Sequence, residues 1–127
     1  MPQVVFSEGA LPPLPVFSQA VISRGLVFAS GNIGITREGT LVEGGIKGQT
    51  RAALENLEKV LKAANSALDK AVKVNIYITN FADFPALNEV YTEFFNGPVK
   101  PARTCVGVAS LPFGAIVEIE CTAEVAE

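Results

Sequence analysis

The spacing of hydrophobic positions along the chain predicts β-strands that bury one face. Between residues 71 and 79, hydrophobic and polar side chains alternate. Strands of this kind pack one face on helices or on another sheet. The side chains expected on the buried face are Val72, Val74, Ile76 and Ile78. Shorter hydrophobic runs predict strands at residues 3–6, 18–23 and 26–30, and a tight turn at Arg24 and Gly25 joins the last two.

Two segments have the periodicity of amphipathic helices instead. The first spans residues 45–65 and ends near Asn65, a residue that suits a helix C-terminus. The second spans residues 83–96, with Asp83 as the expected N-cap and a Gly-Pro pair directly after it. Their hydrophobic faces comprise Ala53, Leu54, Leu57, Leu61 and Ala64 in the first, and Phe84, Leu87, Tyr91, Phe94 and Phe95 in the second.

The last quarter of the chain, residues 101–125, predicts a β-hairpin. Two runs of alternating character flank a turn that contains Pro112 and Gly114. In the first run, Arg103 and Cys105 share one face of the strand. In the second run, Glu118 and Glu120 lie on one face and the hydrophobic residues of the same strand lie on the other. Strands, helix, strand, helix, strands is the order of an α+β or α/β sandwich with two helices on one face of a mixed sheet. The other face must meet solvent or another subunit.

The composition of the chain indicates which kinds of partner the protein can bind. With 127 residues the chain forms one domain, residues 1–127, and 49% of these are hydrophobic and only 18% charged. Part of the surface must therefore be apolar, which favours a homo-oligomer. The net charge of -3, the pI near 5.0 and the lack of a Lys/Arg cluster argue against nucleic acid as the main partner.

Three features of the sequence indicate where the protein is located. No hydrophobic run reaches transmembrane length, so no membrane association is expected. No basic residue precedes Arg24, so neither a secretory signal nor an Arg-rich transit peptide is expected. Cys105 and Cys121 are predicted to be free thiols in a reducing compartment, which indicates the cytoplasm. A Pro-x-x-Pro motif at Pro12 and Pro15 is interpreted as a rigid loop rather than a polyproline ligand.

Histidine is absent from the sequence, which excludes much of the usual catalytic repertoire. A Ser-His-Asp triad, a Cys-His dyad and a histidine zinc site are all impossible. Chemistry must rest on Arg, carboxylates, backbone groups and water, with Cys, Lys or Tyr as further candidates. Arg103 is the most unusual of these, because it lies in a strand of small and apolar residues. A buried guanidinium needs an anionic partner, either Glu118 or Glu120 or a bound carboxylate.

The segment around Arg103 and the strand that carries Glu118 resemble a known family. Residues 101–106 (Pro-Ala-Arg-Thr-Cys-Val), followed by Leu-Pro at 111–112 and Val-Glu-Ile-Glu at 117–120, resemble the signature of the RidA (YjgF/YER057c/UK114) family. Ser-Gln-Ala at 18–20, Ser-Gly at 30–31 and the two helical segments agree with it. The resemblance implies a chorismate-mutase-like fold with a six-stranded mixed sheet, assembled as a homotrimer with clefts between subunits.

The resemblance also implies an activity. Members of this family hydrolyse reactive enamines and imines, such as 2-aminoacrylate, 2-iminopropanoate and 2-iminobutanoate, to 2-keto acids and ammonia, without a cofactor or a metal. By position, Arg103 would grip the substrate carboxylate, and Glu118 would position water and move protons. The substrate cleft would be lined by Phe17, Ser30, Gly31, Asn88 and Cys105. No nucleophilic role is expected for the Cys105 thiol, which lacks a histidine to activate it.

Two departures from the family pattern affect the expected cleft. Phe17 replaces the usual tyrosine, so a phenolic hydroxyl is lost, and Asn32 and Gly34 replace a glutamine and a proline. Both bear on substrate preference and rate more than on fold. Two other functions remain open: a non-enzymatic ligand-binding or holdase-like oligomer, and the ribonuclease or translation-inhibitor activity attributed to some relatives.

Overall fold

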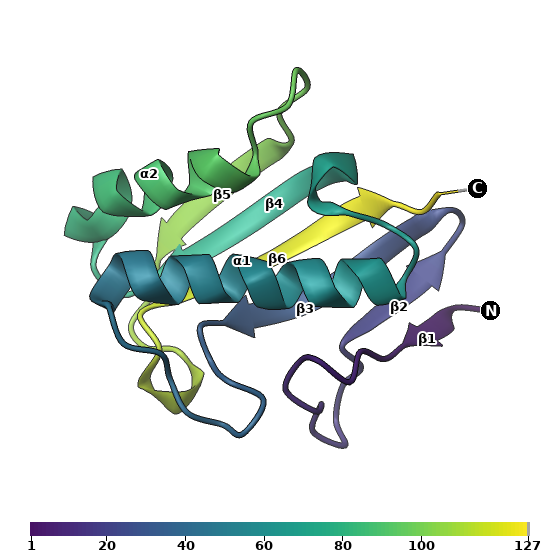
Figure 1. Ribbon diagram of the computed structural model, residues 1–127, viewed down its shortest axis with the longest axis horizontal. Coiled ribbons are helices and arrows are strands. Elements are labelled where there is room, and N and C mark those ends of the chain that lie inside the picture. Colours follow the sequence, from purple (N-terminus) through teal and green to yellow (C-terminus); the bar gives the residue numbers. More distant parts are fainter. Residues whose placement is uncertain (127) are drawn as a thin grey trace.

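A six-stranded mixed sheet carries both helices on one face (Figure 1). The computed structural model describes residues 1–126. The strands lie in the order β1-β2-β3-β6-β4-β5. Their bounds are β1 Gln3–Val5, β2 Ala20–Ser23, β3 Leu26–Ile33, β4 Ala71–Ile78, β5 Ala102–Gly107 and β6 Val117–Glu124. The helices are α1 Gly45–Ala63 and α2 Phe84–Phe94. The predicted α+β sandwich, with two helices on one side of a mixed sheet, is therefore confirmed.

The predicted C-terminal hairpin is wrong, because β5 and β6 are not neighbours. β5 pairs in parallel with β4, so that β4, α2 and β5 form a βαβ crossover. β6 instead enters the middle of the sheet, antiparallel to both β3 and β4. Alternation of residue types identifies a strand but not the strand it pairs with. The hydrophobic side chains of β6 from Val117 to Ala123 are all buried, which suits a central strand.

Two irregularities correct the predicted strand patterns. β3 does not stop at Ser30 but continues to Ile33, with a shift in its pairing with β6 between Ala29 and Asn32. A second shift, between Ala71 and Lys73 of β4, turns Val72 out of the core. Val72 is 43% exposed, whereas Ala71 is buried in its place. Such bulges redirect single side chains without ending the strand.

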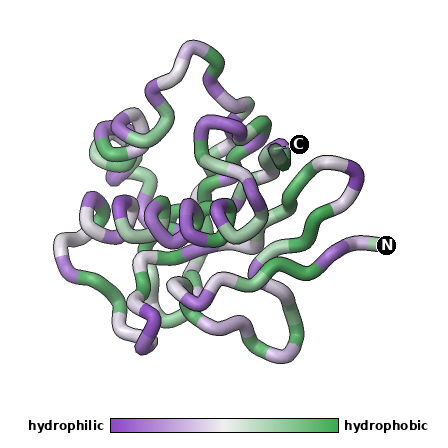
Figure 2. Tube along the Cα trace, turned by 45° about the vertical axis from the view of Figure 1, so that its right-hand side comes forward, coloured by the Kyte–Doolittle hydropathy of each residue, from purple (hydrophilic) through white to green (hydrophobic). Residues whose placement is uncertain are grey.

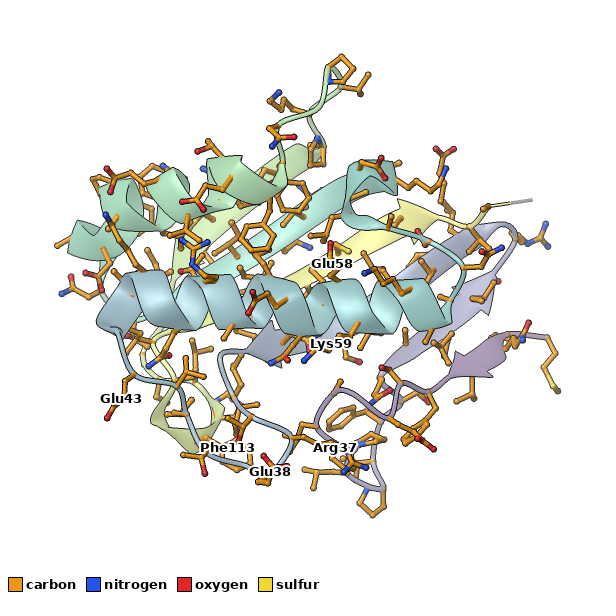
Figure 3. The ribbon with its side chains drawn as sticks, viewed as in Figure 1. Arg37, Glu38, Glu43, Glu58, Lys59 and Phe113 are labelled. Atoms are coloured by element: carbon orange, nitrogen blue, oxygen red, sulfur yellow. The ribbon has the colours of Figure 1, made fainter. Side chains whose placement is uncertain are left out.

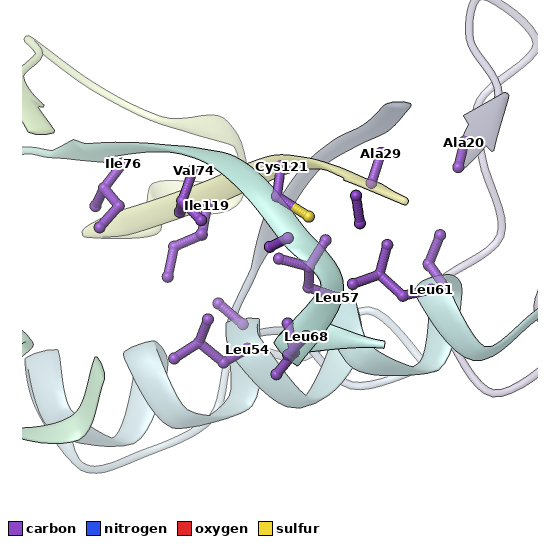
Figure 4. Packing of buried hydrophobic residues seen from close by; sticks show 14 of the residues in the cluster. Ala20, Ala29, Leu54, Leu57, Leu61, Leu68, Val74, Ile76, Ile119 and Cys121 are labelled. Carbon is purple, nitrogen blue, oxygen red and sulfur yellow. The ribbon is translucent and has the colours of Figure 1, made fainter. Parts of the chain in front are cut away.

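The core lies between α1 and the sheet (Figure 4). Leu54, Leu57 and Leu61 of α1 face the side chains of the central strands, among them Val74 and Ile119, and all five are fully buried. The hydrophobic face predicted for this helix is confirmed. Hydrophilic and hydrophobic colours alternate along its turns in Figure 2, as expected for a helix with one buried side.

Two polar side chains of α1 hold the chain at the end of β3 and just before β6. Asn56 Nδ2 donates hydrogen bonds to the carbonyl oxygens of Ile33 (3.1 Å), the last residue of β3, and of Ile35 (2.8 Å), two positions further on. Gln49 Oε1 accepts a hydrogen bond of 2.9 Å from the backbone N–H of Ile116, just before β6. These buried contacts fix the end of the sheet at which the candidate site lies.

The helix ends agree with the predictions in part. α1 stops at Ala63, and Asn65 adopts the left-handed conformation (φ 59°) that terminates helices. α2 ends at Phe94, two positions before the predicted Asn96. Asp83 occupies the N-cap position of α2, but its side chain makes no capping hydrogen bond.

Candidate functional site

An apolar cleft opens at the end of the sheet where the loop before β2 meets the turn before β6. It has a volume of about 390 Å³. We call it the Glu118 cleft, because Glu118 is the only charged side chain among the described residues that line it. The lining residues are Leu11, Pro12, Leu14, Phe17, Ser30, Gly31, Ile33, Pro112, Phe113 and Glu118. Four predicted site residues therefore come together here: Phe17, Ser30, Gly31 and Glu118.

Glu118 projects from β6 on the face of the sheet opposite the helices, and Gly31 of β3 makes room for it. A Cβ atom added at Gly31 would lie 2.5 Å from Glu118 Oε2 and 2.9 Å from its Cγ. Only glycine accommodates the carboxylate in this position. Burial, and in second place the charge of Glu120, raise the pKa of Glu118 above its ordinary value. This carboxyl group therefore holds its proton at higher pH than an exposed glutamate does, which suits proton transfer.

Two polar residues hold the loop that carries Phe17. Ser30 Oγ donates a hydrogen bond of 2.7 Å to the carbonyl oxygen of Ser18, so this hydroxyl already has a structural contact. The buried Gln19 side chain accepts from the backbone N–H of Ser7 (2.6 Å) and donates to the carbonyl oxygens of Ser7 (3.2 Å) and Leu11 (3.0 Å). Sequence reasoning missed Gln19 as a site determinant. Its only signal was its place between Ser18 and Ala20 in the family-like segment.

Arg103 lies elsewhere, on β5 beneath α2. Its Nη1 donates a hydrogen bond of 2.7 Å to Asn88 Oδ1. Its Cζ lies 4.8 Å from the centre of the Tyr91 ring and 5.5 Å from that of Phe84, within the range of cation–π attraction. Throughout residues 1–126, no carboxylate lies within ion-pair distance of this guanidinium. The sequence did not indicate that Phe84 or Tyr91 contacts Arg103, because their helical spacing is that of residues packed in a hydrophobic core.

Neither Glu118 nor Glu120 neutralises Arg103. Arg103 is aligned with Val74 and shares its helix-covered face of the sheet, whereas Glu118 and Glu120 are aligned with Tyr77 and Asn75 on the opposite face. Glu120 instead accepts hydrogen bonds from the Tyr77 hydroxyl (3.0 Å) and Asn75 Nδ2 (3.4 Å). The interpretation of Arg103 as half of an internal ion pair with either glutamate is therefore wrong, because the strand register places the guanidinium and the two carboxylates on opposite faces of the sheet.

Cys105 follows Arg103 on the same face of β5. It is partly buried, and both cysteines are free, as predicted. Burial raises the pKa of the Cys105 thiol, although the charge of Arg103 opposes this effect. The thiol therefore remains protonated and is a poor nucleophile. Nearby, burial raises the pKa of Tyr91 to about 12, and its hydroxyl finds no hydrogen-bond partner among residues 1–126.

The predicted site residues thus form two groups within one chain. Phe17, Ser30, Gly31 and Glu118 line the Glu118 cleft, and Asn88, Arg103 and Cys105 lie under α2 on the other face of the sheet. No group of three or more metal-binding side chains suited to hold an ion occurs in residues 1–126. In the same part of the chain, neither helix is both long and apolar enough to cross a bilayer.

These features are those of a two-layer α+β protein with an apolar, carboxyl-bearing cleft and a separate guanidinium that no carboxylate of residues 1–126 neutralises. Comparison with known proteins identifies the family. The profile of the family described as Endoribonuclease L-PSP matches residues 8–125, and the chain belongs to this family, which includes the YjgF and RidA proteins.

Relatives in this family have varied names. The 2-iminobutanoate/2-iminopropanoate deaminase of Dermatophagoides farinae is 44% identical over 121 residues, which cover 94% of each chain. The mitochondrial protein mmf2 of Schizosaccharomyces pombe is 47% identical over 110 residues, covering 84% of this chain and 86% of that protein. The crystal structure of YyfA from Yersinia pestis, described as a member of the conserved Rid protein family, has a TM-score of 0.94 at 40% identity. The superposition covers 98% of this chain and 100% of the YyfA chain.

Proposed function

We propose that this protein hydrolyses reactive 2-imino acids and their enamine tautomers to 2-keto acids and ammonia. The observation that carries the proposal is the guanidinium of Arg103, which is partly buried and, within residues 1–126, is bonded only to the neutral amide of Asn88. A buried cation without an anion is costly, and a carboxylate from a small acid would neutralise it. The deaminase name of the relative from Dermatophagoides farinae supports the same substrate class.

The chemistry requires orientation, water and one group that moves protons. Arg103 holds the substrate carboxylate through two parallel N–H···O bonds, and Asn88 keeps the guanidinium plane in position. Glu118 in its ionised form takes a proton from water as the oxygen adds to C2 of the imine. The imine nitrogen receives this proton from Glu118, which gives a carbinolamine. The carbinolamine collapses once Glu118 has carried its hydroxyl proton to its amino nitrogen. Its C–N bond breaks, ammonia leaves and the C2 carbonyl of the keto acid forms, with no net change in oxidation state.

Because Arg103 and Glu118 face opposite sides of the sheet, we propose that the complete site forms between subunits of a homotrimer. Arg103, Asn88 and Cys105 of one subunit would face the Glu118 cleft of the next. Exposed hydrophobic side chains on the open face and around the cleft, such as Phe28 (44% exposed) and Phe17 (48%), support subunit contact. A ring of heterologous contacts closes at three subunits and gives three equivalent clefts.

Mixing two inactive variants tests the shared site directly. Arg103→Ala and Glu118→Gln are each expected to be nearly inactive alone. In randomly mixed trimers, about a quarter of the clefts would combine a native arginine with a native glutamate, and activity should return in proportion. A trimeric mass with no recovery on mixing would contradict the shared site. A monomeric mass at micromolar concentration would contradict the assembly.

The reaction itself is tested with a coupled assay. A pyridoxal-phosphate dehydratase generates 2-aminoacrylate from serine, and release of pyruvate is followed with and without this protein. We expect release to accelerate in proportion to the protein concentration. If release does not change at high protein concentration, the catalytic proposal fails and the alternative of a ligand-binding or holdase-like oligomer is favoured.

Three further expectations remain proposals. The chain acts as one domain, residues 1–127, without a cofactor, and it resides in the cytoplasm. Because the mmf2 relative is named as mitochondrial, cell fractionation is the test of location. We do not propose the endoribonuclease activity of the family description, since a net charge of -3 provides little attraction for a phosphate backbone.

A further inference from the structure

The Glu118 cleft is much larger than a three-carbon imino acid requires. Its volume of about 390 Å³ lies in the range of about 300–1,000 Å³ that holds drug-sized ligands. Apart from Glu118, Ser30 and the backbone of Gly31, its walls are hydrocarbon. A small acid bound by its carboxylate and imine groups would cover only part of this surface, even with Arg103, Asn88 and Cys105 of the neighbouring subunit set against the cleft.

Two walls of the cleft come from segments that the fold holds in place. One is the loop with Leu11, Leu14 and Phe17, which the Gln19 side chain ties down at Ser7 and Leu11. Phe17 contributes a ring without the hydroxyl that the family pattern would place there.

The facing wall is the turn Pro112–Gly114, which lies at the lower edge of the molecule in Figure 3. The Ala115 N–H donates a hydrogen bond of 3.1 Å to the Pro112 carbonyl, and Ala115 itself is buried. These contacts anchor the turn on both sides of its tip.

Phe113 at the tip of this turn is the most unusual residue of the cleft. Its backbone has φ 61°, a left-handed conformation that bulky residues rarely adopt, and its ring is 61% exposed. Both features cost stability, and glycine would avoid both. A large exposed ring held in a strained conformation at the mouth of a cleft indicates a role in binding rather than in folding.

We propose that the cleft selects 2-imino acids with large hydrocarbon side chains, branched or aromatic, over the three-carbon 2-iminopropanoate, and that Phe113 is a specificity-determining residue. This inference rests on the proposed imine hydrolysis. With the carboxylate held by Arg103 of the neighbouring subunit and C2 beside Glu118, the side chain extends between Phe113 and the wall that carries Leu14 and Phe17. Each methylene buried there improves transition-state binding by about tenfold or more.

The test compares imines that a flavin-dependent amino-acid oxidase releases from leucine, phenylalanine and alanine. The measured quantity is the ratio of kcat/KM for each large imine to that for the alanine-derived imine. We expect ratios of at least about tenfold in the native protein. Phe113→Gly, which removes the ring and relieves the backbone, should lower the ratios by about tenfold. Phe6→Ala is the matched control, since Phe6 is also exposed (53%) but does not line the cleft, and should leave the ratios unchanged.

The outcomes separate this inference from the proposed function. Acceleration of no imine at all would overturn both. Hydrolysis in which the alanine-derived imine is preferred would overturn the inference alone and would mean that the neighbouring subunit fills the apolar walls. A preference for large imines that Phe113→Gly leaves intact would overturn the role of Phe113.

Discussion

Replacing Arg103 by lysine removes the planar fork of the guanidinium but keeps its positive charge. The Nη1 group already donates one hydrogen bond to Asn88, and the remaining N–H groups can still bind both oxygens of a carboxylate. Each charge-assisted bond is worth about 1.5–3 kcal/mol. Lysine can replace one of the two, so Arg103→Lys should lower kcat/KM by about 10- to 150-fold. Arg103→Ala loses both bonds and should cost about 10²- to 10⁴-fold.

The lysine variant is the sharper test because it disturbs the fold less. The guanidinium lies over the rings of Tyr91 and Phe84, and each cation–π contact contributes about 0.5–2 kcal/mol. Lysine retains part of this attraction, whereas alanine leaves an unfilled space between the rings. Activity is measured in the coupled imine assay, and unfolding by urea reports whether the native state persists.

Arg51→Lys provides the matched control. Arg51 is an exposed arginine of α1, paired with Glu93 at 2.8 Å; it does not line the Glu118 cleft and makes no hydrogen bond to the Arg103 group within residues 1–126. Such a surface pair contributes little, so kcat/KM should not change. If Arg103→Lys also leaves kcat/KM unchanged while the native fold persists, bidentate binding of the carboxylate by Arg103 is refuted.

Three further changes test other parts of the site. Glu118→Gln should lower kcat by about 10²- to 10⁴-fold. Because the folded-state pKa of Glu118 is raised, the native protein loses stability as the pH rises through that value. In urea titrations the variant should lose less stability than the native protein as the pH rises above the ordinary pKa of glutamate, and an identical loss would contradict the buried carboxyl. Gly31→Ala places a methyl group 2.5 Å from Glu118 Oε2 and should lower kcat by about 10- to 100-fold by displacing it. Gly97→Ala, where an added methyl meets nothing within 4 Å, is the control that must remain active. Tyr91→Phe removes a buried hydroxyl that has no hydrogen-bond partner in the described part of the chain, so the free energy of unfolding should stay equal or rise by up to about 1 kcal/mol. A clear loss of stability would reveal a partner for that hydroxyl.

Much of the secondary structure, and the family, followed from the sequence alone. Alternation along β4 and the helical spacing of Leu54, Leu57 and Leu61 are local signals, because each depends on neighbours a few positions away. The same holds for the motif around Arg103 and for the left-handed end of α1 at Asn65. These features specify which segments are strands or helices and most of the side chains that share a face, although the bulge that turns Val72 outward is not visible in them.

Which strands are neighbours, and where the predicted site residues meet, depends on long-range pairing that the sequence pattern does not contain. Strand pairing joins segments far apart in the chain, so the pattern of residues 101–125 suited a hairpin as well as the observed crossover. Once β4 separates β5 from β6, Arg103 falls on the helix-covered face and Glu118 on the open one. A signature that reads as one site in the sequence is therefore divided by the sheet, because the direction of a side chain depends on the pairing of its strand as well as on its place in the alternation.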